Sequence, residues 1–131
     1  HPTRLKGYWK YTSTPISHSS SEFTHLIGQP DTAIVYAALV NLQSPLEIRT
    51  NPNNRQLLDK HADYVIAYGE VTSGESIAGW TEFDLEFEYY RTNETPTYLI
   101  MVSTSSKYGD YFTGGDGSIL WLDDFSLGWD Y

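Results

Sequence analysis

Hydrophobic and polar residues alternate along much of the chain, which is the pattern that half-buried β-strands produce. In residues 4–12, RLKGYWKYT, every second side chain from Leu5 to Tyr11 falls on one face, and the lysines fall on the other. Residues 80–90 alternate more strictly, because an apolar face that starts at Phe83 is matched by an acidic face that starts at Glu82. Both segments therefore predict strands with one buried face.

Other segments are apolar on both faces, and turn-forming residues separate them at regular intervals. Residues 32–41 and 97–105 carry few polar side chains, which is typical of strands in the middle of a sheet. The sequence therefore predicts an all-β fold, a sandwich or a barrel of antiparallel strands. The predicted strands cover residues 4–12, 32–41, 46–50, 64–72, 80–90, 97–105 and 118–131, and one short helix is predicted within 51–61.

The composition narrows the partners that such a domain would bind. The 131 residues suit a single domain, and the formal charge of −9 argues against binding to nucleic acid or anionic lipid. Neutral glycans and cations remain compatible with this charge. The chain has no cysteine, which excludes disulfides and zinc–thiolate sites. No apolar run approaches the roughly 18 residues of a membrane-spanning helix, so no membrane insertion is expected.

The most unusual stretch is SSKYGDYFTGGDGS, residues 105–118, which joins two predicted strands. Its glycines allow tight backbone turns, so aromatic and polar side chains can be presented together. Sugar recognition needs both kinds, because C–H faces stack on aromatic rings while hydroxyls require hydrogen-bond partners. The alternative is a structural loop in which a tyrosine covers the end of the sandwich and the aspartates form turns. The predicted ligand contacts in this loop are Lys107, Tyr108, Asp110, Tyr111 and Asp116.

Tryptophans supply a further candidate contact. Trp9 and Trp121 lie inside predicted strands, and we expect them in the core. Trp80 opens a strand on the face opposite to Phe83, so we expect it to be exposed and to act as a platform on which a sugar ring stacks.

Two groups of acidic residues carry other candidate chemistry. Asp123 and Asp124 are adjacent in an apolar strand, so alternation would turn one of them inward, where a cation or backbone N–H groups must compensate its charge. A β-bulge that turns both carboxylates outward is the alternative. The acidic face of residues 82–88 places carboxylates roughly 7 Å apart, as in inverting glycosidases, but a solvated strand face gives the same pattern.

Four segments that run from Leu5 to about Trp129 carry a family resemblance: LKGYWKYT, VIAYGE, WTEFDLEFEY with the following TPTYLIMVSTSSKYGDYFTGGDGS, and LWLDDFSLGW. They resemble the putative carbohydrate metabolism domain, called PCMD, of Bacteroidetes surface proteins. The resemblance implies a jelly-roll sandwich, similar to carbohydrate-binding modules of the galactose-binding-like type. Such modules often hold a structural calcium near the matching strand, so the resemblance makes Asp123 and Asp124 candidate metal ligands.

The resemblance also implies where the domain lies in its parent protein and where that protein is located. Members of the family typically lie at the C-terminal end of longer exported chains. We therefore expect residues 1–131 to be one module of a bacterial cell-surface or periplasmic protein, with neighbouring domains as partners.

The leading hypothesis is a non-catalytic module that binds a glycan. One alternative is an interaction domain that docks neighbouring domains or an adhesion partner, which predicts a flat apolar patch in place of a groove. A glycoside hydrolase is the second alternative, and it requires two carboxyls that face each other across a cleft.

Overall fold

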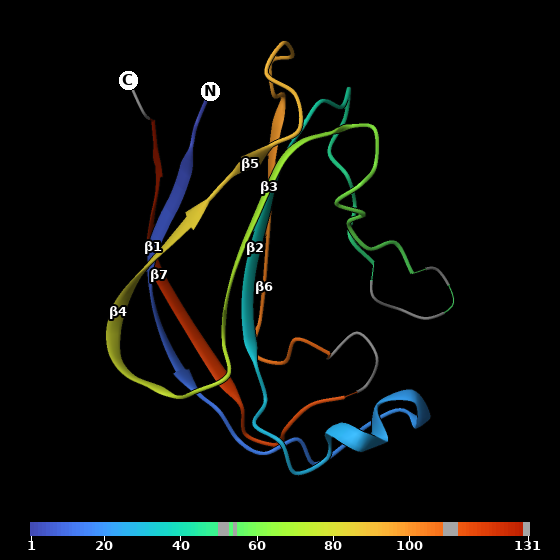
Figure 1. Ribbon diagram of the computed structural model, residues 1–131, viewed down its shortest axis with the longest axis vertical. Helices are drawn as coiled ribbons and strands as arrows, with labels where there is room; N and C mark the ends of the chain where they lie inside the picture. Colours follow the sequence, from blue (N-terminus) through green and yellow to red (C-terminus); the bar gives the residue numbers. More distant parts are fainter. Residues whose placement is uncertain (50–52, 54, 109–112, 130–131) are drawn as a thin grey trace.

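The computed structural model describes residues 1–49, 53, 55–108 and 113–129, which fold as two antiparallel β-sheets packed face to face (Figure 1). This confirms the predicted all-β sandwich. One sheet has the order β4-β1-β7, with β4 at Ile77–Glu86, β1 at Arg4–Thr12 and β7 at Ile119–Gly128. The other has the order β5-β3-β2-β6, at Glu88–Tyr89, Val65–Ser73, Ala33–Val40 and Tyr98–Thr104. No helix among the described residues is long and apolar enough to cross a membrane.

The core lies between the two sheets and uses the faces that the alternation predicted. Leu5 and Trp9 of β1 are buried, whereas Tyr8 between them is exposed on the outer face. Removing such apolar surface from water stabilises the fold by roughly 25 cal/mol per Å². The buried cluster consists of Leu5, Trp9, Val35, Ala37, Leu39, Ala67, Phe83, Leu85 and Phe87.

The chain passes from one sheet to the other at Phe87, which separates β4 from β5. β4 pairs with β1, whereas β5 pairs with β3. At the crossing the chain lies against Gly69 of β3, where a Cβ atom would stand 2.4 Å from Leu85 Cδ2 and 2.5 Å from the Glu86 carbonyl oxygen. The close approach of these two strands therefore requires glycine at position 69.

The described residues of the segment between β2 and β3 lie on the outer face of the four-stranded sheet (Figure 1). A hydrogen bond of 2.9 Å from the Asn41 N–H to the Tyr64 carbonyl joins the two ends of this segment. Its apolar side chains form a second buried cluster with the sheet, at the end of β2 that carries Ala38 and Val40. This second cluster is centred on Ala38, Val40 and Val65, against which Leu42, Leu58, Ala62 and Tyr64 pack.

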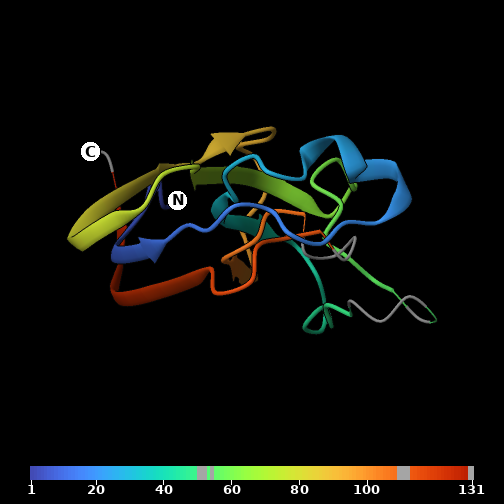
Figure 2. The same cartoon turned by 90° about the horizontal axis from the view of Figure 1, so that it is seen from below.

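The 3-10 helix η1, Ser21–Leu26, and the loop after β6 lie together at one end of the sandwich (Figure 2). Two backbone hydrogen bonds join the segments that flank them: the His18 N–H donates to the Gly114 carbonyl (3.1 Å), and the Gly114 N–H donates to the His18 carbonyl (3.0 Å). This end therefore brings the segment after β1 into contact with the segment before β7.

Three local predictions are wrong. Residues 46–49 form no strand beyond an isolated bridge between Arg49 and Gln56, because no further strand pairs with them, and residue 50 is outside the described residues. The helix expected within 51–61 is absent from its described part, residues 53 and 55–61, which lies in the irregular cover over the sheet. Residues 97–105, expected as a central strand, form the edge strand β6, where the narrower facing sheet leaves Leu99 and Met101 exposed. The jelly-roll connectivity that the resemblance implies stays a prediction.

Candidate functional site

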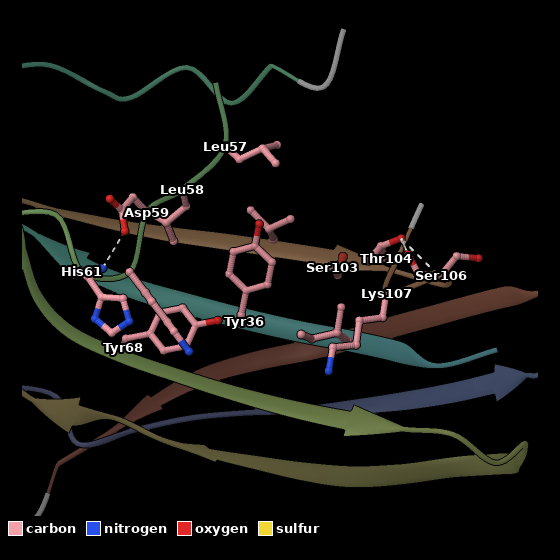
Figure 3. A pocket seen from close by; sticks show the side chains of 13 residues that line it. Tyr36, Leu57, Leu58, Asp59, His61, Tyr68, Ser103, Thr104, Ser106 and Lys107 are labelled. Carbon is pink, nitrogen blue, oxygen red and sulfur yellow. Dashed lines mark hydrogen bonds between the residues drawn. The ribbon is translucent and has the colours of Figure 1, made fainter. Parts of the chain in front are cut away.

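Next to this second cluster, the outer face of the four-stranded sheet carries a groove of about 630 Å³ (Figure 3). Its floor comes from β2, β3 and β6, whose outward side chains form one layer because Tyr36 lies opposite Val102 in the sheet register. Residues 57–61 form one wall, and the start of the loop after β6 forms the far end. The lining residues are Ile34, Tyr36, Leu57, Leu58, Asp59, Lys60, His61, Tyr68, Val102, Ser103, Thr104, Ser106 and Lys107.

Two tyrosine rings form the centre of the floor. The ring centroids of Tyr36 and Tyr68 lie 6.0 Å apart with an angle of 33° between the planes. The Tyr68 hydroxyl donates to Glu70 Oε2 at 3.0 Å. Burial raises the pKa of Tyr68 well above its ordinary value, and the Glu70 carboxylate acts in the same direction. The Tyr68 ring therefore stays uncharged at neutral pH.

Polar and cationic groups surround this floor. Lys60 places its Nζ 5.4 Å from the centroid of the Tyr68 ring, a cation–π contact. The Asp59 carboxylate accepts a hydrogen bond from the His61 N–H at 2.9 Å, which fixes the turn of the wall. At the other end the Lys107 N–H donates to the Thr32 carbonyl at 2.7 Å, so the backbone that carries this lysine is tied to the start of β2.

A buried carboxylate, Asp31, holds the loop after β6 in place. Only 1% of the residue is exposed. Its Oδ2 accepts hydrogen bonds from Ser106 Oγ at 2.5 Å, from Ser118 Oγ at 2.9 Å and from the Gly115 N–H at 2.9 Å, while its Oδ1 accepts one from the Thr32 N–H at 2.9 Å. These donors compensate the burial of its charge. The sequence reasoning missed Asp31, because an aspartate just before a strand is usually a turn residue.

The residues predicted as one ligand site lie in three places. Lys107 lines the groove. Tyr108 packs on Phe23 of η1, with ring centroids 5.2 Å apart, and Asp116 Oδ2 lies within hydrogen-bond distance, 3.1 Å, of His18 Nε2. Trp80 lies on the other sheet. Asp110 and Tyr111 are outside the described residues.

Trp80 belongs to an aromatic face on the outside of the three-stranded sheet. The Lys10 Nζ lies 4.8 Å from the Trp80 ring centroid and 5.2 Å from that of Trp121. Trp80 is exposed as expected, but the prediction that Trp121 belongs to the core is wrong, since 40% of it is exposed. Trp121 pairs with Lys10 in the register and therefore shares its outward face, while Leu120 and Leu122 pack inward.

Asp123 and Asp124 lie at an irregularity in the pairing of β7 with β1, which is the β-bulge alternative considered for this pair. Asp124 has a φ of 55°, in the left-handed region, and its N–H donates to Asp123 Oδ1 at 2.9 Å. Both carboxylates are exposed, beside a hollow of about 240 Å³ that Tyr8 and Trp80 also line. Across the described residues, no group of three or more His, Asp or Glu side chains is arranged to hold a metal ion.

The acidic face predicted for residues 82–88 is divided between the sheets. Glu82, Asp84 and Glu86 are exposed on β4, where Arg4 Nη1 forms an ion pair with Asp84 Oδ2 at 2.8 Å. Glu88 lies beyond the crossing, on β5. Glu88 lines a hollow of about 320 Å³ together with Glu70 and Glu86. This hollow adjoins the groove, because Lys60, His61 and Tyr68 line both.

Comparisons with known proteins agree with this fold. A crystal structure from Bacteroides thetaiotaomicron, described as a putative glycoside hydrolase, is 23% identical and has a TM-score of 0.70 over 99% of this chain. One from Bacteroides vulgatus, with the same description, is 26% identical and has a TM-score of 0.66 over 98% of this chain. The chain spans 38% and 52% of the lengths of these two proteins. No curated protein sequence matches it significantly.

The family comparison confirms the resemblance found in the sequence. The family described as "Putative carbohydrate metabolism domain" matches residues 1–128, which include both sheets and every residue of the groove. The chain therefore belongs to the PCMD family and is a domain related to carbohydrate metabolism.

Proposed function

We propose that the chain is a non-catalytic carbohydrate-binding module, and that its ligand lies in the groove over Tyr36 and Tyr68. The observation that carries the proposal is the pairing of a tyrosine floor with a rim of hydroxyl and ammonium groups. A pyranose ring has apolar C–H faces and polar edges, so it can stack on the floor while its hydroxyls bond to the rim. A groove of about 630 Å³ has room for a short oligosaccharide.

Glycan arrays followed by calorimetric titration test the proposal. We expect Tyr36→Ala and Tyr68→Ala each to weaken binding at least about tenfold, since about 1.4 kcal/mol of stacking is removed. Trp80→Ala is the matched control, because it removes an exposed aromatic side chain on the other sheet. The groove is not the site if Trp80→Ala abolishes binding while the tyrosine variants, shown by melting to be folded, bind normally.

The same titrations separate binding from catalysis. A binding module leaves the oligosaccharide intact, whereas a glycoside hydrolase releases new reducing ends from it. Glu70, Glu86 and Glu88 are the carboxylates of the hollow next to the groove, so loss of reducing-end release in Glu70→Gln, Glu86→Gln or Glu88→Gln would establish the enzyme alternative.

The docking alternative is supported by the aromatic face on the three-stranded sheet. Tyr8, Trp80 and Trp121 are exposed there around the Lys10 ammonium group. The occupant that suits this face is another domain of a longer parent chain, since this chain spans about half or less of the two similar structures. If no glycan binds in the array, docking is the function that the exposed tryptophans favour.

The calcium site stays a prediction that rests on the family resemblance. Calcium takes six to eight oxygen ligands, and Asp123 and Asp124 supply only part of such a shell. If calcium binds here, millimolar calcium raises the melting temperature, because an ion that binds the folded state stabilises it. Asp123→Asn would remove that rise. Identical melting curves with calcium and with chelator would show that the bulge holds no calcium.

A further inference from the structure

We infer that the groove selects acidic glycans, with Lys60 and Lys107 as the groups that bind the sugar carboxylates. This inference rests on the proposed function and names the ligand class for the same groove. Uronic acids combine the pyranose face that a tyrosine floor accepts with a carboxylate that neutral sugars lack.

The distribution of charge over the chain is the first observation that supports the inference. The chain has a formal charge of −9 and four lysines, at positions 6, 10, 60 and 107. Two of the four, Lys60 and Lys107, line the groove, where Asp59 is the one acidic residue. Two lysines against one acidic residue give the lining a formal charge of +1 on a chain of −9, which favours an anionic ligand there over the rest of the surface.

The second observation is that both ammonium groups are available. Among the described residues, Lys60 and Lys107 form no ion pair, in contrast to Arg4, Arg49 and Arg91. Lys60 lies over the Tyr68 ring, and Lys107 lies 5.8 Å from the centroid of the Tyr108 ring. Asp59 accepts a hydrogen bond from the backbone of His61. A ligand carboxylate can therefore approach either lysine without displacing another carboxylate.

The third observation is the position of the lysines relative to the floor. Figure 3 shows His61 and Tyr68 at one end of the groove and Lys107 at the other, with Tyr36 between them. Because Lys60 lies over Tyr68, an oligosaccharide on the two rings meets an ammonium group at each end. Beyond Tyr68 the neighbouring hollow carries Glu70, Glu86 and Glu88, which disfavour an extended anionic chain in that direction. An acidic ligand therefore lies between Tyr68 and Lys107.

Matched acidic and neutral probes test the inference. Oligogalacturonate, alginate oligosaccharides and glucuronate-containing oligosaccharides are each titrated beside their methyl-esterified or carboxyl-reduced forms. At low ionic strength we expect at least one acidic probe to bind at least tenfold more tightly than its neutral form. The advantage shrinks in 0.5 M salt, because mobile ions screen the attraction between charges at a solvent-exposed site.

Lysine variants assign the effect to the groove. We expect Lys60→Gln and Lys107→Gln each to weaken binding of the acidic probe at least threefold more than binding of its neutral form, because only the acidic probe loses an ion pair. Lys6→Gln is the control on the other sheet and leaves both affinities unchanged. Neutral probes that bind as tightly as their acidic forms, or an acidic preference that survives both groove variants, would overturn the inference and leave the proposed function standing. Absence of binding by every probe and by the glycan array would remove the proposed function itself.

Discussion

Replacing Asp31 by alanine is expected to cost on the order of 3–5 kcal/mol of unfolding free energy, which lowers the melting temperature by roughly 10–15 °C. The carboxylate is buried and accepts four hydrogen bonds, from Thr32, Ser106, Gly115 and Ser118. Alanine leaves these half-buried donors without their acceptor, and a donor that loses its partner away from bulk water is costly. Chemical denaturation followed by fluorescence measures the change.

The controls for Asp31→Ala separate the hydrogen bonds from the volume of the side chain. Asp31→Asn keeps the shape but replaces an acceptor with an N–H₂ donor, so we expect it also to destabilise the fold clearly. Asp116→Ala removes an exposed aspartate whose partner is the exposed His18, and it should change stability by less than about 1 kcal/mol. A loss below 1 kcal/mol in Asp31→Ala would contradict the view that this carboxylate holds the loop.

Replacing Gly69 by alanine is expected to destabilise the protein by about 2–3 kcal/mol, although it adds a single methyl group. A Cβ atom would come within 2.4 Å of Leu85 Cδ2 and 2.5 Å of the Glu86 carbonyl oxygen. The leucine end could move aside, but the carbonyl belongs to the backbone at the crossing between the sheets. The strands must therefore separate by several tenths of an ångström, which opens the core beside Leu85.

Gly79 provides the matched control for Gly69. It lies in β4, is exposed, and has no atom within 4 Å of the position that a Cβ would take. Gly79→Ala should leave stability unchanged or raise it by up to about 1 kcal/mol, because alanine restricts the unfolded chain. Thermal and denaturant unfolding of the two variants measures the difference. Equal stability of Gly69→Ala and Gly79→Ala would mean that the crossing tolerates a wider separation than the structure shows.

Alternation predicted the sandwich because it follows directly from burial of one face of each strand. Leu5 and Trp9 of β1 and Leu85 of β4 lie where the pattern placed them. The alternation also indicates that Trp121 faces outward, since Leu120 and Leu122 on either side of it face inward. The expectation of a buried Trp121 ignored this parity and relied on the position of the residue inside a predicted strand.

The groove could not be predicted in the same way, because its parts come from distant segments of the chain. Tyr36 stands in an apolar strand that resembles a fully buried one, yet it lines the groove, because the second cluster packs against Ala38, Val40 and Val65. Where those side chains pack depends on the tertiary structure of a segment without regular elements. Lys107 was predicted as a ligand contact because it lies in a glycine-rich loop. The position of that loop depends on Asp31, far away in sequence, which accepts hydrogen bonds from Ser106 and Gly115 on either side of it.

The crossing at Phe87 has a consequence for cooperativity. One uninterrupted stretch of chain supplies an edge strand to the three-stranded sheet through β4 and an edge strand to the four-stranded sheet through β5. If one sheet unfolded alone, it would displace the connection at Phe87 and with it the edge strand of the other sheet. We therefore expect the domain to unfold as a single cooperative unit, so that a ligand bound to one layer also protects the amides of the opposite layer from hydrogen exchange.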